Sequence, residues 1–229
     1  MPMTRQHLRP TAEPKSVLDN QRIHWETTYA QYSNLFGLKP SYSARKAVEI
    51  FKRENSNKIL ELGGGQGRDA IFFAKSDFRV WTLEYTKRGV EAIKRKTEHA
   101  GLSKPITVRR HDVRMPLPFN DEVFDACYSH MLYCMALTTG ELESLANEVR
   151  RVLKSRGLSI YTARNTDDKH YGKGIHRGED MYEVDGFIVH FFSKEKVKHL
   201  AQGYKVLDVE EFQEGPLPRN LFLVMLRKK

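Results

Sequence analysis

The sequence predicts an α/β fold in which a parallel sheet is covered by helices on both faces. Short runs of apolar residues, typical of buried strands, alternate along the chain with longer stretches in which apolar residues recur every three or four positions. Strand–helix–strand units of this kind connect parallel strands and place the helices over the sheet. The 229 residues, of which 40% are apolar, are enough for one domain with a substantial core.

The N-terminal part of the chain differs from the rest. Residues 1–18 are polar and interrupted by prolines, so we expect a flexible tail there and a single domain over residues 19–229. Within residues 19–55, Trp25, Tyr29 and Tyr32 recur at spacings that place them on one helix face. Ser41 is in position to cap a second helix.

Strands and helices then alternate up to the end of the chain. The predicted strands are apolar runs bounded by turn or polar residues, namely residues 58–62, 79–84, 106–108, 123–129, 158–162, 204–209 and 221–226. Helical patterns lie around residues 70–74, over 89–99, from the capping-box pair Thr138 and Glu141 to Gly157, and after Ser193. Residues 163–187 are polar and rich in glycine, and we expect a long loop there.

The composition excludes some classes of protein. The net charge of +9 permits a nucleic-acid partner without requiring one, because the basic residues are scattered and mostly alternate with apolar positions. Two cysteines, Cys127 and Cys134, exclude a disulfide-stapled scaffold and favour a cytoplasmic location. We expect no membrane span, because no apolar run approaches the roughly 20 residues required, and the first residues lack the apolar stretch of a signal peptide.

The strongest local signal is a glycine-rich turn, ELGGGQG at residues 61–67, at the end of the first predicted strand. Gly63, Gly65 and Gly67 allow the backbone to turn sharply and to approach a ligand without an intervening Cβ. The amides at the start of the following helix would point at that ligand. A plain tight turn accounts for such glycines equally well, so the turn alone does not define a ligand.

Two carboxylates make the turn more informative, because parallel sheets bind ligands at the carboxyl ends of their strands. Glu84 ends the second predicted strand, where it can accept hydrogen bonds from both hydroxyls of a ribose. Asp112 and Val113 follow the third strand, where a carboxylate can accept from the exocyclic amine of adenine and an amide can donate to its ring. A dinucleotide fits less well, because the sixth position of the turn is Arg68 where that fingerprint needs glycine.

The order and spacing of these segments resemble the class I S-adenosylmethionine-dependent methyltransferases. The resemblance runs from about residue 59 to residue 161 and includes ILELGGGQG, VWTLE, HDV and FDACYS. It implies S-adenosylmethionine as cofactor, a Rossmann-like sheet of seven mostly parallel strands, a helical cap over residues 19–55 and an acceptor-side loop over residues 163–187. The residues it implies for the cofactor are Glu61, Gly63, Gly64, Gly65, Gly67, Glu84, Tyr85, Asp112, Val113 and Ser129.

A second resemblance concerns the methyl acceptor. The Asp-to-Gly run at residues 167–174, followed by FFS at 191–193, is similar to the branch that contains tellurite- and thiol-methylating enzymes. It implies a small-molecule acceptor that attacks the sulfonium methyl in line. His130, directly after the fourth strand, is the candidate general base, and a histidine that only bonds the cofactor or packs under the cap is the alternative. Candidate acceptor contacts are Tyr133, Asn165, Asp167, His170 and Tyr171.

Other functions stay open at this point. An RNA or other nucleic-acid methyltransferase fits the net charge, although neither cysteine follows a proline as in cytosine-C5 enzymes. A non-catalytic module that binds the cofactor and regulates a partner fits the same glycine turn and carboxylates. We expect no metal site, because the histidines have no compact ligand spacing, and the sequence leaves the acceptor and the oligomeric state undetermined.

Overall fold

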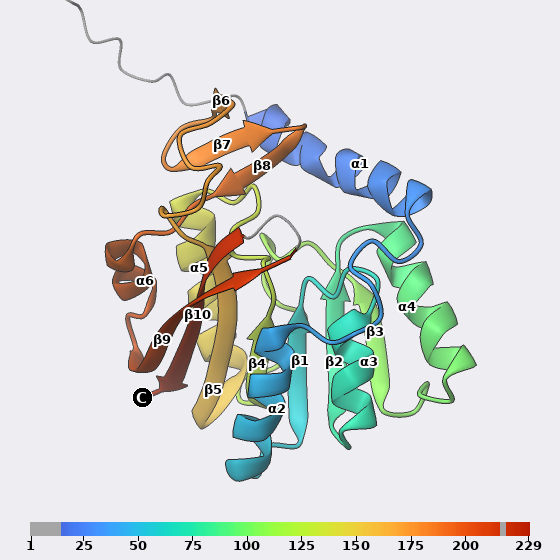
Figure 1. Ribbon diagram of the computed structural model, residues 1–229. Coiled ribbons are helices and arrows are strands. Elements are labelled where there is room, and N and C mark those ends of the chain that lie inside the picture. Colours follow the sequence, from blue (N-terminus) through green and yellow to red (C-terminus); the bar gives the residue numbers. More distant parts are fainter. Residues whose placement is uncertain (1–14, 216–218) are drawn as a thin grey trace, which may run out of the picture.

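A seven-stranded central sheet organises the molecule, for which the computed structural model describes residues 15–215 and 219–229 (Figure 1). The strand order is β3-β2-β1-β4-β5-β10-β9. Only β10 runs antiparallel to its neighbours, so the expected mostly parallel sheet is confirmed. The strands are β1 (Lys58–Leu62), β2 (Arg79–Glu84), β3 (Ile106–Arg110), β4 (Phe124–Ser129), β5 (Leu153–Arg164), β9 (Tyr204–Glu214) and β10 (Arg219–Lys228).

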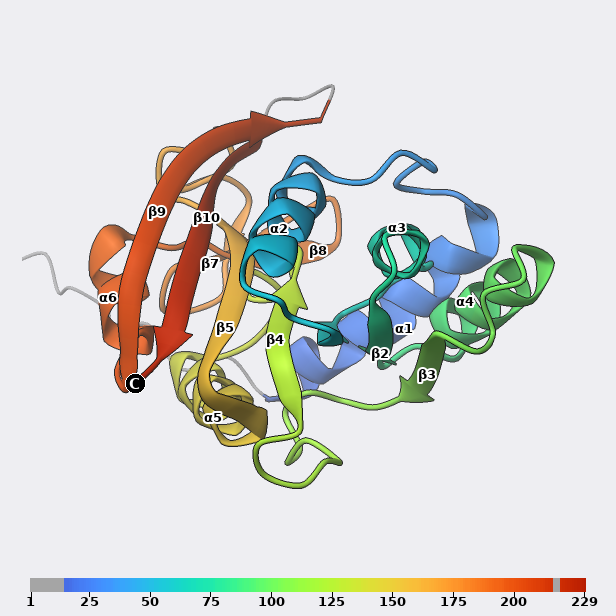
Figure 2. The same ribbon diagram turned by 90° about the horizontal axis from the view of Figure 1, so that it is seen from below.

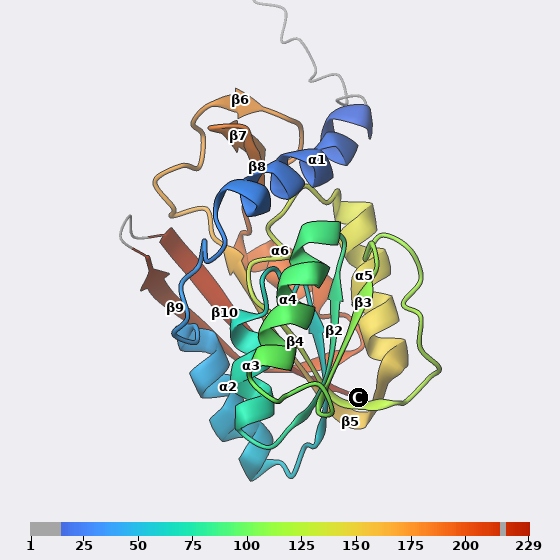
Figure 3. The same ribbon diagram turned by 90° about the vertical axis from the view of Figure 1, so that its right-hand side faces the viewer.

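Helices cover both faces of this sheet, as predicted. One face packs against α2 (Tyr42–Arg53), α3 (Arg68–Lys75) and α4 (Lys87–His99). The other packs against α5 (Thr139–Val152) and α6 (Lys194–Leu200) (Figures 2 and 3). Side chains alternate between the two cores along each strand, so that Ile59 belongs to one cluster and Leu60 to the other.

The predicted helix starts are confirmed by their hydrogen bonds. The Ser41 hydroxyl accepts from the Ala44 amide at 3.0 Å, and Ser193 caps α6 in the same way. Thr138 and Glu141 form the expected capping box at the start of α5. The end of α5 differs from the prediction. Leu153, expected within the helix, has extended backbone angles and begins β5.

A further layer lies across the carboxyl ends of the parallel strands (Figures 1 and 3). It consists of α1 (Lys15–Gln31) and a small antiparallel sheet, β6 (Ile175–His176), β7 (Met181–Val184) and β8 (Phe187–His190). Because α1 begins at Lys15, the expected tail is shorter than predicted, and residues 1–14 lie outside the described residues. No helix in the described part of the chain is long and apolar enough to cross a membrane.

The small sheet corrects the prediction of a long loop over residues 163–187. Asp185 and Gly186 have φ of +52° and +80°, the conformation of a two-residue hairpin turn. Met181 and Ile188 are buried with Leu18 of α1 in a cluster of their own. The Asp-Gly pair between alternating apolar residues was the signal for this hairpin, and the polar composition of the segment concealed it.

Candidate functional site

The glycine-rich turn connects β1 to α3 and packs against β2. Gly63 and Gly65 have φ of +71° and +54°, a region that residues with a Cβ rarely adopt. The amides of Gly63 and Gly64 both donate to the carbonyl oxygen of Leu83, at 2.9 and 3.1 Å. A Cβ on Gly64 would overlap the hydroxyl oxygen of Thr82. The turn therefore needs glycine for its own packing as well as for the approach of a ligand.

Glu84 ends β2 beside this turn, with only 3% of its surface exposed. One carboxylate oxygen accepts from the Gly65 amide at 2.9 Å, and the other accepts from the amide and hydroxyl of Thr86 at 2.8 and 2.7 Å. Burial raises the pKa of Glu84, although these donors act in the opposite direction. Because all three donors are neutral and a carboxylate offers about four lone pairs, Glu84 retains capacity for a further donor.

Glu61 is a second buried carboxyl group beneath the turn. Its Oε2 accepts from the Thr82 hydroxyl at 2.7 Å. Burial, and then the neighbouring charge of Asp69, raise the pKa of Glu61 to about 8. A cation bound near the turn would lower this pKa, because a nearby positive charge favours the ionised carboxylate.

Asp112 follows β3 and is held by Arg114. The Arg114 Nε lies 3.0 and 3.1 Å from the two carboxylate oxygens, and Nη2 lies 2.6 Å from Oδ2. Burial acts to raise the pKa of Asp112, but the bonds from Arg114 outweigh it and keep the pKa below its ordinary value. Tyr85 lies beside this group, and burial followed by the charge of Glu84 raises its pKa. Glu84 and Asp112 thus stand at the ends of adjacent strands.

The helix α1 covers this edge and is fixed at several points. Glu26 accepts from the amides of Lys87 and Arg88 at 2.6 and 3.0 Å, at the N-terminus of α4. Trp25 packs on Phe187 of the hairpin, with ring centroids 4.8 Å apart. Below the helix, the Tyr29 hydroxyl lies 3.1 Å from where a Cβ on Gly65 would stand. The helix α1 therefore lies over the glycine turn, whereas α2, which the predicted cap over residues 19–55 also included, packs on one face of the sheet instead.

The turn after β4 is fixed by a buried polar network. The Nδ1 of His130 lies 3.0 Å from the Ser43 hydroxyl and 3.1 Å from the Thr162 hydroxyl. Its Nε2 lies 3.1 Å from Oε2 of Glu214 at the end of β9. Both ring nitrogens are engaged within the protein, so His130 acts as a direct base only if it releases Glu214. The preceding Ser129 is buried and its Oγ has no partner among the described residues.

The candidate acceptor contacts are mostly engaged elsewhere. Tyr133 is buried and stacks on Tyr161 at 4.2 Å between ring centroids. Asn165 is buried, and its Oδ1 accepts from the amide of Asp167, whose side chain is exposed. The Nδ1 of His170 lies 3.0 Å from a guanidinium nitrogen of Arg164, and the Tyr171 hydroxyl donates to Asp180 at 3.1 Å. Their contact with an acceptor stays a prediction.

Sequence reasoning missed several residues that shape this edge. Arg164 and Asp168 form a buried ion pair beneath the loop after β5. Gln66 accepts from the Leu35 amide and donates to the Tyr32 carbonyl, which ties the chain after α1 to the glycine turn. The two bonds of Gln66 join residues 31 and 34 positions apart, so local pattern gave no signal for them.

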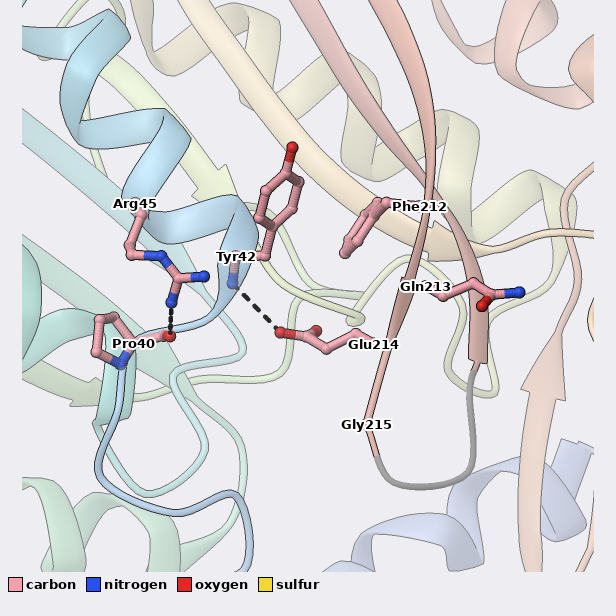
Figure 4. Close-up of a pocket in the computed structure, with 7 residues that line it drawn as sticks. All are labelled: Pro40, Tyr42, Arg45, Phe212, Gln213, Glu214 and Gly215. Atoms are coloured by element: carbon pink, nitrogen blue, oxygen red, sulfur yellow. Dashed lines mark hydrogen bonds between the residues drawn. The ribbon is translucent and has the colours of Figure 1, made fainter.

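A cavity of about 340 Å³ lies between the start of α2 and the end of β9 (Figure 4). Tyr42 and Phe212 form one wall, with ring centroids 5.1 Å apart. Arg45 donates to the carbonyl oxygen of Pro40 at 2.8 Å. The amide of Tyr42 donates to Oε1 of Glu214 at 3.3 Å, so this carboxylate separates the cavity from His130.

Comparison with known proteins identifies a methyltransferase domain within this fold. Residues 59–157 match the family model described as a methyltransferase domain. The chain is 27% identical over 197 residues to an uncharacterized protein, MJ1252, of Methanocaldococcus jannaschii, a match that covers 82% of this chain and 72% of the relative. The chain therefore carries a methyltransferase domain, whose matched part covers residues 59–157.

Two solved structures show how far the fold is shared. The 1,6-didemethyltoxoflavin-N1-methyltransferase of Burkholderia thailandensis, solved with 1,6-didemethyltoxoflavin and S-adenosylhomocysteine, matches with a TM-score of 0.75 at 12% identity. The match covers 97% of this chain and 93% of that one. TehB from Haemophilus influenzae matches with a TM-score of 0.65 at 15% identity over 90% and 67% of the two chains. The expected seven-stranded methyltransferase fold is therefore confirmed.

The residues at this edge fit S-adenosylmethionine, the cofactor of this class. Buried Glu84 accepts only neutral donors and has room for one further donor, such as a ribose hydroxyl. The turn at residues 63–67 presents backbone without side chains, and the unpartnered Ser129 Oγ lies buried at the next strand end. Two carboxyl groups near the turn suit a ligand with a positively charged sulfur.

Proposed function

We propose that this protein transfers the methyl group of S-adenosylmethionine to a small-molecule acceptor, bound between the ends of β4 and β5 and the layer formed by α1 and β6–β8. The observation that carries the proposal is this layer, which covers the carboxyl edge and is tied to α4 by Glu26 and to the hairpin by Gln21. A covered edge suits an acceptor small enough to be enclosed, whereas a nucleic-acid duplex needs an open surface. The fold shared with a didemethyltoxoflavin methyltransferase supports it.

In this proposal the cofactor lies across three strand ends. Glu84 accepts hydrogen bonds from the ribose hydroxyls, and Asp112 accepts one from the adenine amine beside Tyr85. The amides and open backbone of residues 63–67 take the methionine portion, with Glu61 supporting the turn. Val113 and Ser129 complete the contacts. The supporting geometry is the shared edge of β1, β2 and β3, whose registers bring these ends together.

The cofactor supplies a methyl group already activated by the sulfonium charge. The protein has to hold the acceptor nucleophile in line with that methyl and the leaving sulfur, and alignment of this kind contributes up to about 7–11 kcal/mol to catalysis. His130 would act by fixing the turn after β4, since both its nitrogens are engaged. This arrangement favours acceptors that need little deprotonation, such as thiols, over hydroxyls.

The proposal is tested by measuring S-adenosylhomocysteine release with a panel of thiols, amines and metalloid oxyanions, and in parallel with total RNA. We expect turnover with at least one small-molecule class and none with RNA. The Glu84→Ala variant is the control, because it should abolish release at low cofactor concentration. Release with RNA alone would assign a nucleic-acid acceptor. Tight cofactor binding without any release would favour the regulatory module.

A further inference from the structure

Arg114 contacts two parts of the molecule that lie far apart in the sequence. On one side its Nε and Nη2 bond the carboxylate of Asp112 at 3.0 and 2.6 Å. On the other side its Nη1 forms an ion pair with Asp19 of α1, 95 residues away. A single planar guanidinium thus connects the strand end proposed for adenine with the helix that covers it.

The bridge is partly shielded from water. The Arg114 side chain is 20% exposed, and those of Asp112 and Asp19 are 30% and 44% exposed. The backbone amide of Arg114 also donates to Asp112 Oδ1 at 3.1 Å. This backbone bond holds Arg114 and Asp112 in one turn. A change in the orientation of the Asp112 carboxylate must therefore move the guanidinium that reaches Asp19.

We propose that Arg114 is a positioning residue of the cofactor site, which orients the Asp112 carboxylate toward adenine and couples occupancy of that position to α1 through Asp19. The proposal rests on the placement of adenine at Asp112 given above. When the adenine amine donates to Asp112, the side chains of Asp112 and Arg114 both lose conformational freedom. The ion pair between Arg114 and Asp19 then forms at a smaller cost in conformational entropy. Coupling between two sites is reciprocal, so the Asp19 contact strengthens adenine binding by the same factor.

The other anchors of α1 make this coupling separable from folding. Gln21 is bonded to the hairpin and Glu26 to the start of α4. Buried Leu18 packs with Met181 and Ile188. Replacing Asp19 removes the tie to the adenine end and leaves these contacts in place, so α1 should stay docked.

The test is calorimetric titration with S-adenosylhomocysteine of the wild-type protein, Asp19→Asn, Arg114→Met and the double variant. Arg114→Met should weaken binding about tenfold or more, because it removes charged hydrogen bonds to Asp112. Asp19→Asn should weaken it about two- to fivefold and should have no further effect once Arg114 is Met. Arg227→Met is the matched control. This substitution removes an ion pair with Glu54 that is about as exposed as the Arg114–Asp112 pair but lies near the end of the sheet opposite the cofactor site. It should leave S-adenosylhomocysteine binding unchanged.

A second readout follows α1 itself by amide hydrogen exchange. S-Adenosylhomocysteine should slow exchange in α1 of the wild type more than in Asp19→Asn. S-Inosylhomocysteine, which lacks the exocyclic amine, should show a smaller difference between the two proteins. Equal affinity of Asp19→Asn and wild type, or effects of the two substitutions that simply multiply, would overturn the coupling. If Asp112→Asn binds S-adenosylhomocysteine as tightly as the wild type, the adenine placement itself fails, which is a separate outcome.

Discussion

The two halves of the carboxyl edge are built in different ways. At the ends of β1 and β2, Glu84 is bonded only by neutral groups close to it in the chain or in the adjoining turn. At the ends of β4 and β5, by contrast, His130 and Arg164 are engaged by distant side chains or buried ion pairs. The first half retains a hydrogen-bond acceptor for a ligand, whereas the polar side chains of the second half are paired with one another. Substitutions in the first half should therefore change ligand affinity, and substitutions in the second should change stability.

The largest expected effect is on stability, in the second half. Arg164→Met leaves the buried carboxylate of Asp168 without its cation, and breaking a buried pair in this way costs about 3–5 kcal/mol. Urea denaturation should show this loss, while S-adenosylhomocysteine affinity at low urea stays unchanged. Lys87→Met is the control, because its pair with Glu91 is exposed and should contribute less than about 0.5 kcal/mol. If Arg164→Met were as stable as the wild type but bound S-adenosylhomocysteine more weakly, the second half would contribute to ligand binding and not to stability, which would contradict the comparison.

The next effect is on affinity, in the first half. Glu84→Ala should weaken S-adenosylhomocysteine binding by about 1–3 kcal/mol, because buried ribose hydroxyls would lose a charged acceptor. Titration calorimetry measures this, and Glu91→Ala, on the exposed side of α4, should bind like the wild type. Unchanged affinity in Glu84→Ala would show that the ribose does not bind at this strand end.

Gly64→Ala should affect both properties, because the turn is part of the core as well as of the site. Its Cβ would overlap the Thr82 hydroxyl, and such overpacking costs about 1–3 kcal/mol. Gly140→Ala is the matched control, since the space around it is open and it lies in the first turn of α5. It should be neutral or slightly stabilising. Thermal denaturation compares the two, and equal melting temperatures would show that the turn tolerates a side chain.

The last effect concerns pH and is measured as a slope of stability against pH. The pKa of Glu61 is raised from 4.5 to about 8 by burial, so between these values the folded protein binds a proton that the unfolded chain has released. Stability contributed by this group therefore falls as pH rises from about 5 to 8. Glu61→Gln should show a shallower decline over this window in urea denaturation at pH 5 and pH 8. An identical decline in both proteins would assign the pH dependence to other groups.

The fold and the first half of the site could be predicted because their signals are local. The glycine turn, Glu84 and Asp112 each follow a recognisable apolar strand, and parallel strand ends meet at one edge. The contacts of the second half could not be predicted from the sequence. The bonds of His130 reach Ser43 and Glu214, each more than 80 residues away, and no periodicity encodes such pairs. The β7–β8 hairpin was missed because the glycines and charged residues around it outweighed its Asp-Gly turn.

The central claim, that an adenosine is held across the ends of β1, β2 and β3 beneath α1, is tested most directly by a crystal structure of the complex with S-adenosylhomocysteine. We expect the ribose hydroxyls within hydrogen-bond distance of Glu84 and the adenine amine within hydrogen-bond distance of Asp112. A ligand bound instead in the cavity between Tyr42 and Phe212, or a Glu84 carboxylate that contacts only Gly65 and Thr86 in the complex, would contradict the account.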